Sequence, residues 1–227
     1  MTTAVQEPVG LLGGSFDPIH AGHLRMARHA QRQLQLGQVR FIPAGQPWQK
    51  VAVSAVTASE HRLRMVQLSI EGQPAFVADT VDLLRPGPSY TVDTLQQLRG
   101  ELGNGVPLVL LVGADQFARL DTWHDWLRLF DLAHVAVARR DGSMLPSVPM
   151  APALAALRGE RLRPDGASAV AGAPAGAIVE LDMAPFDCSS TQIRALVREG
   201  GKQSQARLAE LLAPGVPDYI RQHRLYT

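Results

Sequence analysis

The stretch VGLLGGSFDPIHAGHL, residues 9–24, changes from an apolar run to a glycine-rich turn and then to a helical pattern. Val9–Leu12 is predicted to be a buried strand, and the helix is predicted to begin near Ala21 or Gly22. A strand that leads through a glycine turn into a helix is typical of open α/β sheets, in which ligands bind beyond the carboxyl ends of the strands. The turn at residues 13–19 is therefore the first place where a binding site is expected.

The rest of the chain repeats this alternation of strand and helix. Apolar, β-prone runs predict further strands at Val39–Ile42, Val106–Val112, His134–Ala138 and Ala177–Leu181. Helical patterns lie in residues 24–34, in residues 57–70 behind a TASE capping box from Thr57 to Glu60, in SYTVDTLQQL, in WHDWLRLF and near Pro217. Because alternating strands and helices need crossover connections, the sequence predicts the α/β class, with a mainly parallel sheet and helices on both faces.

Composition favours one globular domain over residues 1–227, with a surface excursion rich in Ala, Pro and Gly at Asp141–Gly176 and a short helix around Ala153–Leu157. Hydrophobic residues make up 46% of the chain, but no run approaches the roughly 20 residues of a membrane span. The single cysteine and the lack of a secretory signal pattern predict a cytoplasmic protein. A net charge of +1 argues against a dedicated nucleic-acid surface.

Two histidines follow the turn, His20 and His23, and their spacing lets both face one anion at the start of the helix. Gly22 between them leaves room for phosphate oxygens. A zinc site is disfavoured because neither HExxH nor a nearby cysteine is present, and the glycine patterns of dinucleotide and Walker loops are absent. From the spacing alone, helix caps and surface groups remain an equally good interpretation of both histidines.

GGSFDPIHAGHL, together with SSTQIR at residues 189–194, resembles the signature of the HxGH nucleotidyltransferase superfamily. Within it, FIPAGQPWQK, PSYTVDTL, LVGADQFARLDTWHDW and VARR are spaced as in the family of bacterial nicotinate-nucleotide adenylyltransferases. The resemblance covers Val9–Tyr226. It implies a Rossmann-like, doubly wound sheet of about five or six strands.

The same resemblance implies an enzyme of NAD biosynthesis that joins nicotinate mononucleotide and ATP into nicotinate adenine dinucleotide and pyrophosphate. Its partners would be those two nucleotides, with Mg2+ accompanying ATP and few protein ligands to the metal. Two other hypotheses stay open. One is an adenylyltransferase for phosphopantetheine or nicotinamide mononucleotide, and the other is a non-catalytic nucleotide-binding regulator. Whether the protein is a monomer or a homodimer also stays open.

By the family pattern, His20, His23 and Arg194 are the expected catalytic residues, with His23 as the main stabiliser of the transition state. The residues expected to bind ATP are Gly13, Gly14, Ser15, Phe16, Lys50, Asp115, Arg139, Ser190 and Thr191. A helix N-terminus and a guanidinium that converge on one polyanion give this assignment a physical basis. The alternative for SST is an ordinary helix cap before a solvated arginine, and the alternative for Asp115 is the cap of the next helix.

For the pyridine half, the resemblance implies stacking of the nicotinate ring on Trp123 and recognition of its carboxylate by backbone amides near Thr91 and His124. Trp126 is expected to be a core residue. The sequence departs from the family pattern at Gln49, Gly45 and Cys188. The first two departures bear on the contacts of the PAGQPWQK loop, whereas Cys188 is read as a small core residue and not as a nucleophile.

Overall fold

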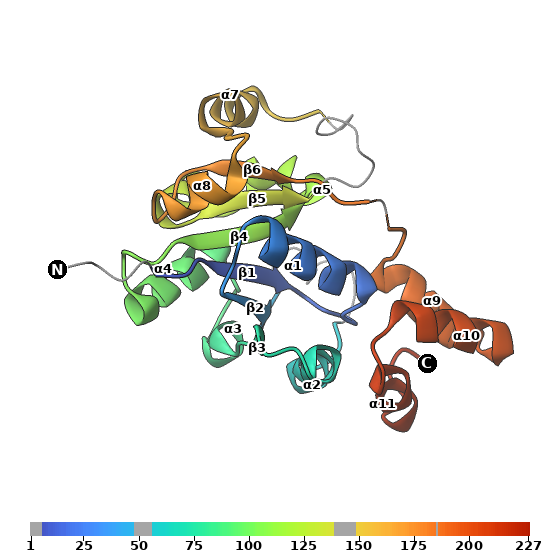
Figure 1. The fold of residues 1–227 in the computed structure, drawn as a ribbon. Coiled ribbons are helices and arrows are strands. Elements are labelled where there is room, and N and C mark those ends of the chain that lie inside the picture. The colour runs from blue at the N-terminus through green and yellow to red at the C-terminus, as the bar shows by residue number, and fades with distance from the viewer. Residues whose placement is uncertain (1–5, 48–55, 139–148, 185) are drawn as a thin grey trace. The chain divides into compact units, whose positions relative to one another are not determined.

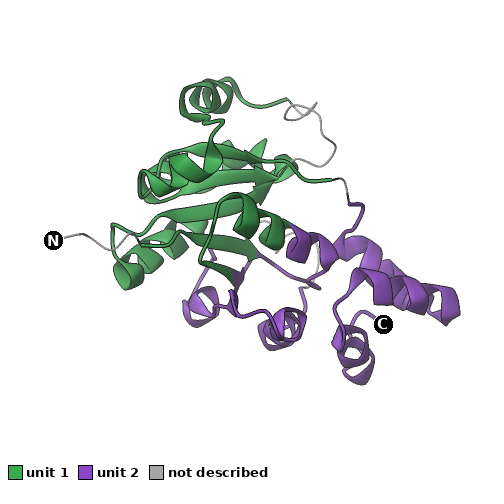
Figure 2. Cartoon of the chain, in the orientation of Figure 1, with its two compact units in different colours: residues 1–13, 26–40, 90–185 green, residues 14–25, 41–89, 186–227 purple. Residues whose placement is uncertain are grey.

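The computed structural model describes residues 6–47, 56–138, 149–184 and 186–227. Two of the predicted ATP contacts, Lys50 and Arg139, lie outside these residues, and so does Gln49. The chain forms two compact units (Figure 2), each built from three separate segments. Unit 1 consists of residues 1–13, 26–40 and 90–185, and unit 2 consists of residues 14–25, 41–89 and 186–227.

The strands form a six-stranded sheet in the order β3-β2-β1-β4-β5-β6 (Figure 1). Their bounds are β1 Val9–Gly14, β2 Gln38–Pro43, β3 Phe76–Ala78, β4 Leu108–Gly113, β5 His134–Ala138 and β6 Ile178–Leu181. The pairs β1–β4, β4–β5 and β5–β6 are parallel. This order is that of doubly wound Rossmann folds, so the predicted fold class is confirmed. The sequence analysis missed β3.

Unit 1 contains β4 and β5, the most deeply buried strands. Every residue of β5 is buried, as are the first five of β4, because both strands are packed on both faces. The helices of this unit are the second half of α1 (Ala21–Gln33), α4 (Thr91–Leu102), α5 (Ala114–Phe117), α6 (Leu129–Leu132), α7 (Pro152–Arg161) and α8 (Gly166–Ala171). Two 3-10 helices, η1 (Leu120–Thr122) and η2 (Trp126–Arg128), precede α6.

The described part of the Ala/Pro/Gly-rich segment, residues 149–176, holds more helix than its composition indicates. It contains α7 and α8 where one short helix was predicted. Leu154 and Val170 are fully buried and anchor one helix each. WHDWLRLF also differs from the prediction of one helix, because it folds as η2 followed by α6.

Unit 2 contains β3, the first turn of α1, and α2 (Ser59–Ile70), α3 (Val81–Leu84), α9 (Ser190–Glu199), α10 (Gly201–Leu211) and α11 (Val216–Gln222). The capping box predicted at Thr57 is wrong: Ala58 is the N-cap of α2, and no side chain caps the helix. The Thr57 backbone N–H instead donates to the Asp17 carboxylate, and the Thr57 carbonyl accepts from the Arg62 guanidinium.

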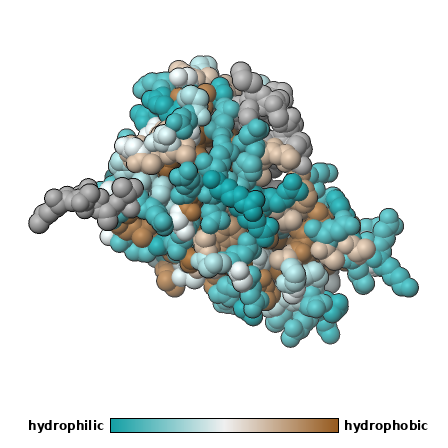
Figure 3. Space-filling model, in the orientation of Figure 1, coloured by the Kyte–Doolittle hydropathy of each residue, from teal (hydrophilic) through white to brown (hydrophobic). Residues whose placement is uncertain are grey.

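The surface drawn in Figure 3 is mainly hydrophilic, with scattered apolar residues. Among the described residues, the large hydrophobic side chains that are exposed are Leu84 and Leu127. No helix in the described part of the chain is long and apolar enough to cross a membrane.

Candidate functional site

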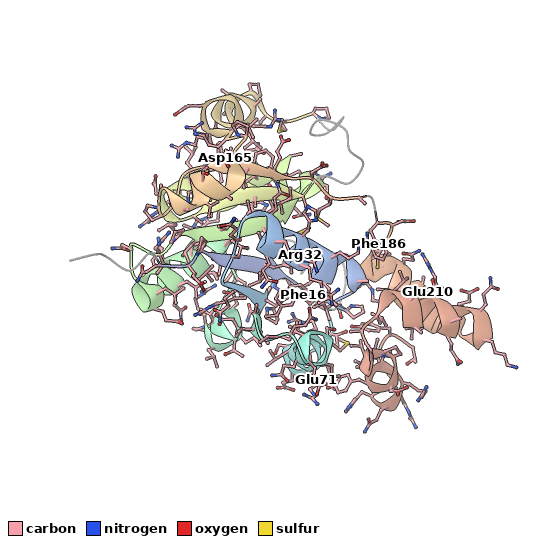
Figure 4. All side chains as sticks on the ribbon, viewed as in Figure 1. Phe16, Arg32, Glu71, Asp165, Phe186 and Glu210 are labelled. Atoms are coloured by element: carbon pink, nitrogen blue, oxygen red, sulfur yellow. The ribbon has the colours of Figure 1, made fainter. Side chains whose placement is uncertain are left out.

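The loop after β1 is shaped by a phenylalanine with unusual backbone geometry. Phe16 has a left-handed backbone, with φ of 48°, which costs a bulky residue roughly 1 kcal/mol. Its ring is buried (Figure 4) and packs edge-on against the His23 ring, with 5.1 Å between centroids. Burial of the Phe16 ring offsets the cost of its left-handed backbone. The ring therefore anchors the loop in the protein interior.

His20 and His23 form a stacked pair at the start of α1, with ring centroids 3.8 Å apart and 29° between planes. The His20 backbone N–H donates to Nδ1 of His23 at 3.2 Å. Since Nδ1 accepts this bond, the proton of the neutral His23 imidazole resides on Nε2. His23 therefore has a fixed ring orientation and an N–H donor at its outer nitrogen.

Gly22 leaves room for the His20 ring against the helix. A Cβ built at this position would lie 3.1 Å from two atoms of the His20 ring. The glycine in the HxGH pattern therefore gives the His20 ring its place against the first turn of α1.

The start of α9 contacts this loop directly. Ser189 caps the helix, with its Oγ accepting from the backbone N–H of Gln192. The Ser190 hydroxyl donates to the Pro18 carbonyl at 3.0 Å, and Arg194 donates to the Asp17 carbonyl at 2.8 Å. The serine cap of the alternative interpretation is thus present, but Arg194 is not a solvated arginine.

Two further contacts order the same region, one within α9 and one between α1 and the segment before α9. Arg194 also donates to Oγ1 of Thr191 at 3.3 Å. The Arg25 guanidinium lies 4.4 Å from the centroid of the Phe186 ring, in the segment that leads to α9 (Figure 4). Unit 2 therefore brings His20, His23, Ser190, Thr191 and Arg194 together, around the amino ends of α1 and α9.

A buried arginine that the sequence analysis missed lies behind the loop. Arg62 of α2 is 1% exposed and donates to the carbonyls of Ser15, Ala44 and Thr57 at 2.7–2.8 Å. Burial lowers the pKa of Arg62 from its ordinary value, while the Asp17 carboxylate acts to raise it. Arg62 shares a helix face with Met65, Val66 and Ser69, and this period was the available signal that Arg62 faces inward.

Gly45, one of the departures from the family pattern, has a steric explanation. A Cβ at Gly45 would collide with the carbonyl oxygen of Asp82, and the Ser89 hydroxyl accepts from the Gly45 backbone N–H at 2.9 Å. The backbone is too close here for a side chain.

Replacement of Gly45 by alanine is therefore expected to lower the free energy of unfolding by about 2 kcal/mol, since backbone must move to admit the methyl group. Urea denaturation measures this difference. Gly100→Ala is the matched control, because that helical position is exposed and has no atom within 4 Å of the added Cβ. Equal stability of the two variants would refute the steric explanation.

A second group of predicted residues lies in unit 1. Thr91 is the first residue of α4, and its neighbour Tyr90 stacks on His124, with ring centroids 4.4 Å apart. Trp123 is half-buried, and its indole Nε1 has no hydrogen-bond partner among the described residues. Trp126, predicted as a core residue, is also only half-buried. The structure thus places the amino end of α4 beside His124.

The structure also tests the predictions for Asp115 as a helix cap and for Cys188 as a core residue. Asp115 is exposed and is the second residue of α5, whose N-cap is Gly113, so the alternative of Asp115 as a helix cap is wrong. Cys188 is half-buried, and burial raises the pKa of its thiol above the ordinary value. Cys188 is therefore not the core residue that was predicted, but a thiol that is harder to ionise is a poorer nucleophile, which agrees with the prediction that it is not a nucleophile. Among the described residues, no cluster of three His, Cys, Asp or Glu side chains could hold a metal ion.

Comparison with known proteins identifies similar sequences over the whole chain. A family model described as cytidylyltransferase-like matches residues 11–196. A relative from Laribacter hongkongensis, named "Probable nicotinate-nucleotide adenylyltransferase", is 45% identical over 226 residues, which cover 100% of this chain and 97% of the relative. A relative of the same name from Dechloromonas aromatica is 46% identical, covering 98% of this chain and 99% of the relative.

A solved structure is similar in fold. Plasmodium falciparum nicotinic acid mononucleotide adenylyltransferase, complexed with NaAD, matches with a TM-score of 0.68 and covers 97% of this chain and 98% of that chain. Its sequence identity is 14%, so the similarity is one of architecture.

Proposed function

Because the chain belongs to the cytidylyltransferase-like family, we propose that it is a nicotinate-nucleotide adenylyltransferase of NAD biosynthesis. It joins nicotinate mononucleotide to the adenylyl group of ATP and releases pyrophosphate. The observation that carries this proposal is the meeting of the loop after β1 with the start of α9, through Ser190 to Pro18 and Arg194 to Asp17. Full-length similarity to relatives with that name supports the choice of substrates.

The chemistry needs positioned donors and no catalytic base. An oxygen of the nicotinate mononucleotide 5'-phosphate, already ionised at neutral pH, attacks the α-phosphorus of ATP. The bond from that phosphorus to the bridging oxygen breaks, and pyrophosphate leaves with the electron pair. The protein has to align the reactants and offset the negative charge that accumulates on the α-phosphate and pyrophosphate.

In the proposed assignment, His23 donates from Nε2 to a phosphate oxygen of ATP, and His20 contacts the same group. Ser190, Thr191 and Arg194 bind the β and γ phosphates at the amino end of α9, where free backbone N–H groups and the helix dipole favour an anion. The Arg194 guanidinium has five N–H donors, so its bonds to Asp17 and Thr191 leave others for phosphate.

Further ATP contacts belong to the same proposal. The backbone of Gly13, Gly14, Ser15 and Phe16 borders the phosphates, and Lys50, Asp115 and Arg139 contribute to nucleotide binding. Mg2+ enters with ATP as part of the substrate, because it keeps its waters and binds mainly through phosphate oxygens.

The cellular compartment and the number of domains are also proposed. We propose that it works in a reducing cytoplasm, since the chain has one cysteine and its thiol is half-buried. We also propose that residues 1–227 fold as one domain, because three of the five boundaries between the units fall inside single elements, namely β1, α1 and β2.

Trp123 is assigned to the nicotinate ring and the amides near Thr91 and His124 to its carboxylate. Trp123→Ala is then expected to weaken nicotinate mononucleotide binding by about tenfold or more, and ATP binding much less, because a stacking surface is lost. Calorimetric titration of each nucleotide measures both constants. Trp126→Ala, which removes a half-buried indole in η2, is the control. Equal weakening of both nucleotides by Trp123→Ala would assign that residue to packing.

Pyrophosphate release tests the reaction itself. The protein is incubated with ATP, Mg2+ and, separately, nicotinate mononucleotide, nicotinamide mononucleotide or phosphopantetheine. We expect fastest release with nicotinate mononucleotide, because amides aimed at a carboxylate favour the acid over the amide. Fastest release with another acceptor would select a sister enzyme, and no release with any of them would leave a nucleotide-binding regulator.

A further inference from the structure

Tyr226 holds the carboxylate of Asp17, which lies in the loop after β1. Asp17 is 5% exposed, and its Oδ1 accepts a hydrogen bond from the Tyr226 hydroxyl at 2.7 Å, across 209 residues of sequence. Its Oδ2 accepts from the backbone N–H of Thr57 at 3.3 Å. A buried carboxylate requires such donors, and one of the two comes from the penultimate residue of the chain.

The backbone after α11 is bent so that this contact can form. Arg224 and Tyr226 have left-handed backbones, with φ of 50° and 66°. The Leu225 backbone N–H returns to the Ile220 carbonyl at 3.0 Å, which closes the turn on the last residues of α11. Two left-handed residues that are not glycine cost free energy, and the bond between Tyr226 and Asp17 is an interaction that offsets that cost.

Tyr226 is fixed as a hydrogen-bond donor. Burial and the Asp17 carboxylate both raise the pKa of the Tyr226 hydroxyl well above its ordinary value, although a hydrogen bond with the Thr57 side chain acts against them. Both effects favour the protonated phenol, whose hydroxyl donates to Asp17.

Asp17 links this contact to the phosphate-binding groups. Its side chain accepts from Tyr226, while its backbone carbonyl accepts from Arg194. The next carbonyl, that of Pro18, accepts from Ser190. The position of this one residue thus sets both the course of the loop and the anchor of the Arg194 guanidinium.

We propose that Tyr226 is a positioning residue of the adenylyl-transfer site, which holds Asp17 so that the HxGH loop and Arg194 keep the geometry needed for the transition state. The inference rests on the proposed function. A misplacement of catalytic groups well below 1 Å is expected to slow the chemical step more than it weakens substrate binding.

The test compares Tyr226→Phe with Tyr219→Phe. Both variants remove one hydroxyl from the C-terminal segment, but the Tyr219 hydroxyl contacts His61 on α2 and not the loop. For Tyr226→Phe we expect a kcat about tenfold below wild type, an almost unchanged KM for nicotinate mononucleotide, and a melting temperature within about 3 °C. Tyr219→Phe is expected to keep the wild-type kcat.

Hydrogen exchange of the backbone amides in residues 15–20 gives a readout without turnover. Tyr226→Phe should speed their exchange several-fold, and Tyr219→Phe should not. If the wild-type protein releases no pyrophosphate, the proposed function fails, whereas faster exchange in Tyr226→Phe alone would still support the positioning role. Unchanged exchange in Tyr226→Phe, or a wild-type kcat in an active protein, would overturn it.

Discussion

Replacement of His23 by alanine is expected to lower turnover by about 100-fold or more, the effect of removing one donor aimed at developing charge. The His23 ring is fixed from two sides, by the bond from the His20 backbone to Nδ1 and by the edge-on Phe16 ring. Its Nε2–H therefore needs no reorientation when charge develops on the α-phosphate. Because this donor acts mainly in the transition state, kcat should fall much more than KM rises.

His29→Ala is the control for this prediction. His29 lies further along α1, and its Nε2 contacts Gln33, so the change removes an imidazole from the same helix without touching the loop. Steady-state pyrophosphate release at saturating ATP compares the two variants. A turnover of His23→Ala close to that of His29→Ala would make His23 a structural cap of α1.

Replacement of Arg62 by methionine is expected to lower the free energy of unfolding by about 3 kcal/mol. Methionine fills part of the space but leaves the carbonyls of Ser15, Ala44 and Thr57 buried without their donor. It also removes the positive charge that accompanies the buried Asp17 carboxylate. The main effect of Arg62→Met should therefore be on the free energy of unfolding, whereas the main effect of His23→Ala should be on turnover.

Arg64→Met serves as the control, because Arg64 is exposed on the same helix and its charge is solvated. Urea denaturation with a common slope measures both free energies. A change below about 0.5 kcal/mol in Arg62→Met would show that the three carbonyls find water or other donors.

Much of the fold could be predicted because most strands are long, apolar and buried on both faces. The run at His134–Ala138 is β5 residue for residue, and the other predicted strands differ from the observed ones by one or two residues at an end. Strand β3 was missed because Phe76–Ala78 is too short for a periodic pattern. The capping box predicted at Thr57 was wrong, and the Thr57 backbone bonds Asp17 and Arg62 instead. A four-residue pattern cannot show the bond to Asp17, which lies 40 residues away in the sequence.

In the candidate site too, local motifs could be predicted and long-range contacts could not. The histidines and the SST helix start are short local motifs, and the structure brings them together in unit 2. The contacts behind them, from Arg62 and Tyr226, join parts of the chain far apart in sequence. Arg62 lies beside His61 and two residues before Arg64, so local composition favours an exposed face over the inward one that the spacing to Met65 indicates. Tyr226 bonds a residue 209 positions away, a contact that no local pattern reports.

A crystal structure with a non-cleavable ATP analogue and Mg2+ tests most directly whether one triphosphate is bound by the loop after β1 and by the start of α9. We predict phosphate oxygens within about 3 Å of His23 Nε2, of the Arg194 guanidinium and of the first backbone N–H groups of α9. A triphosphate bound away from either element would contradict the account.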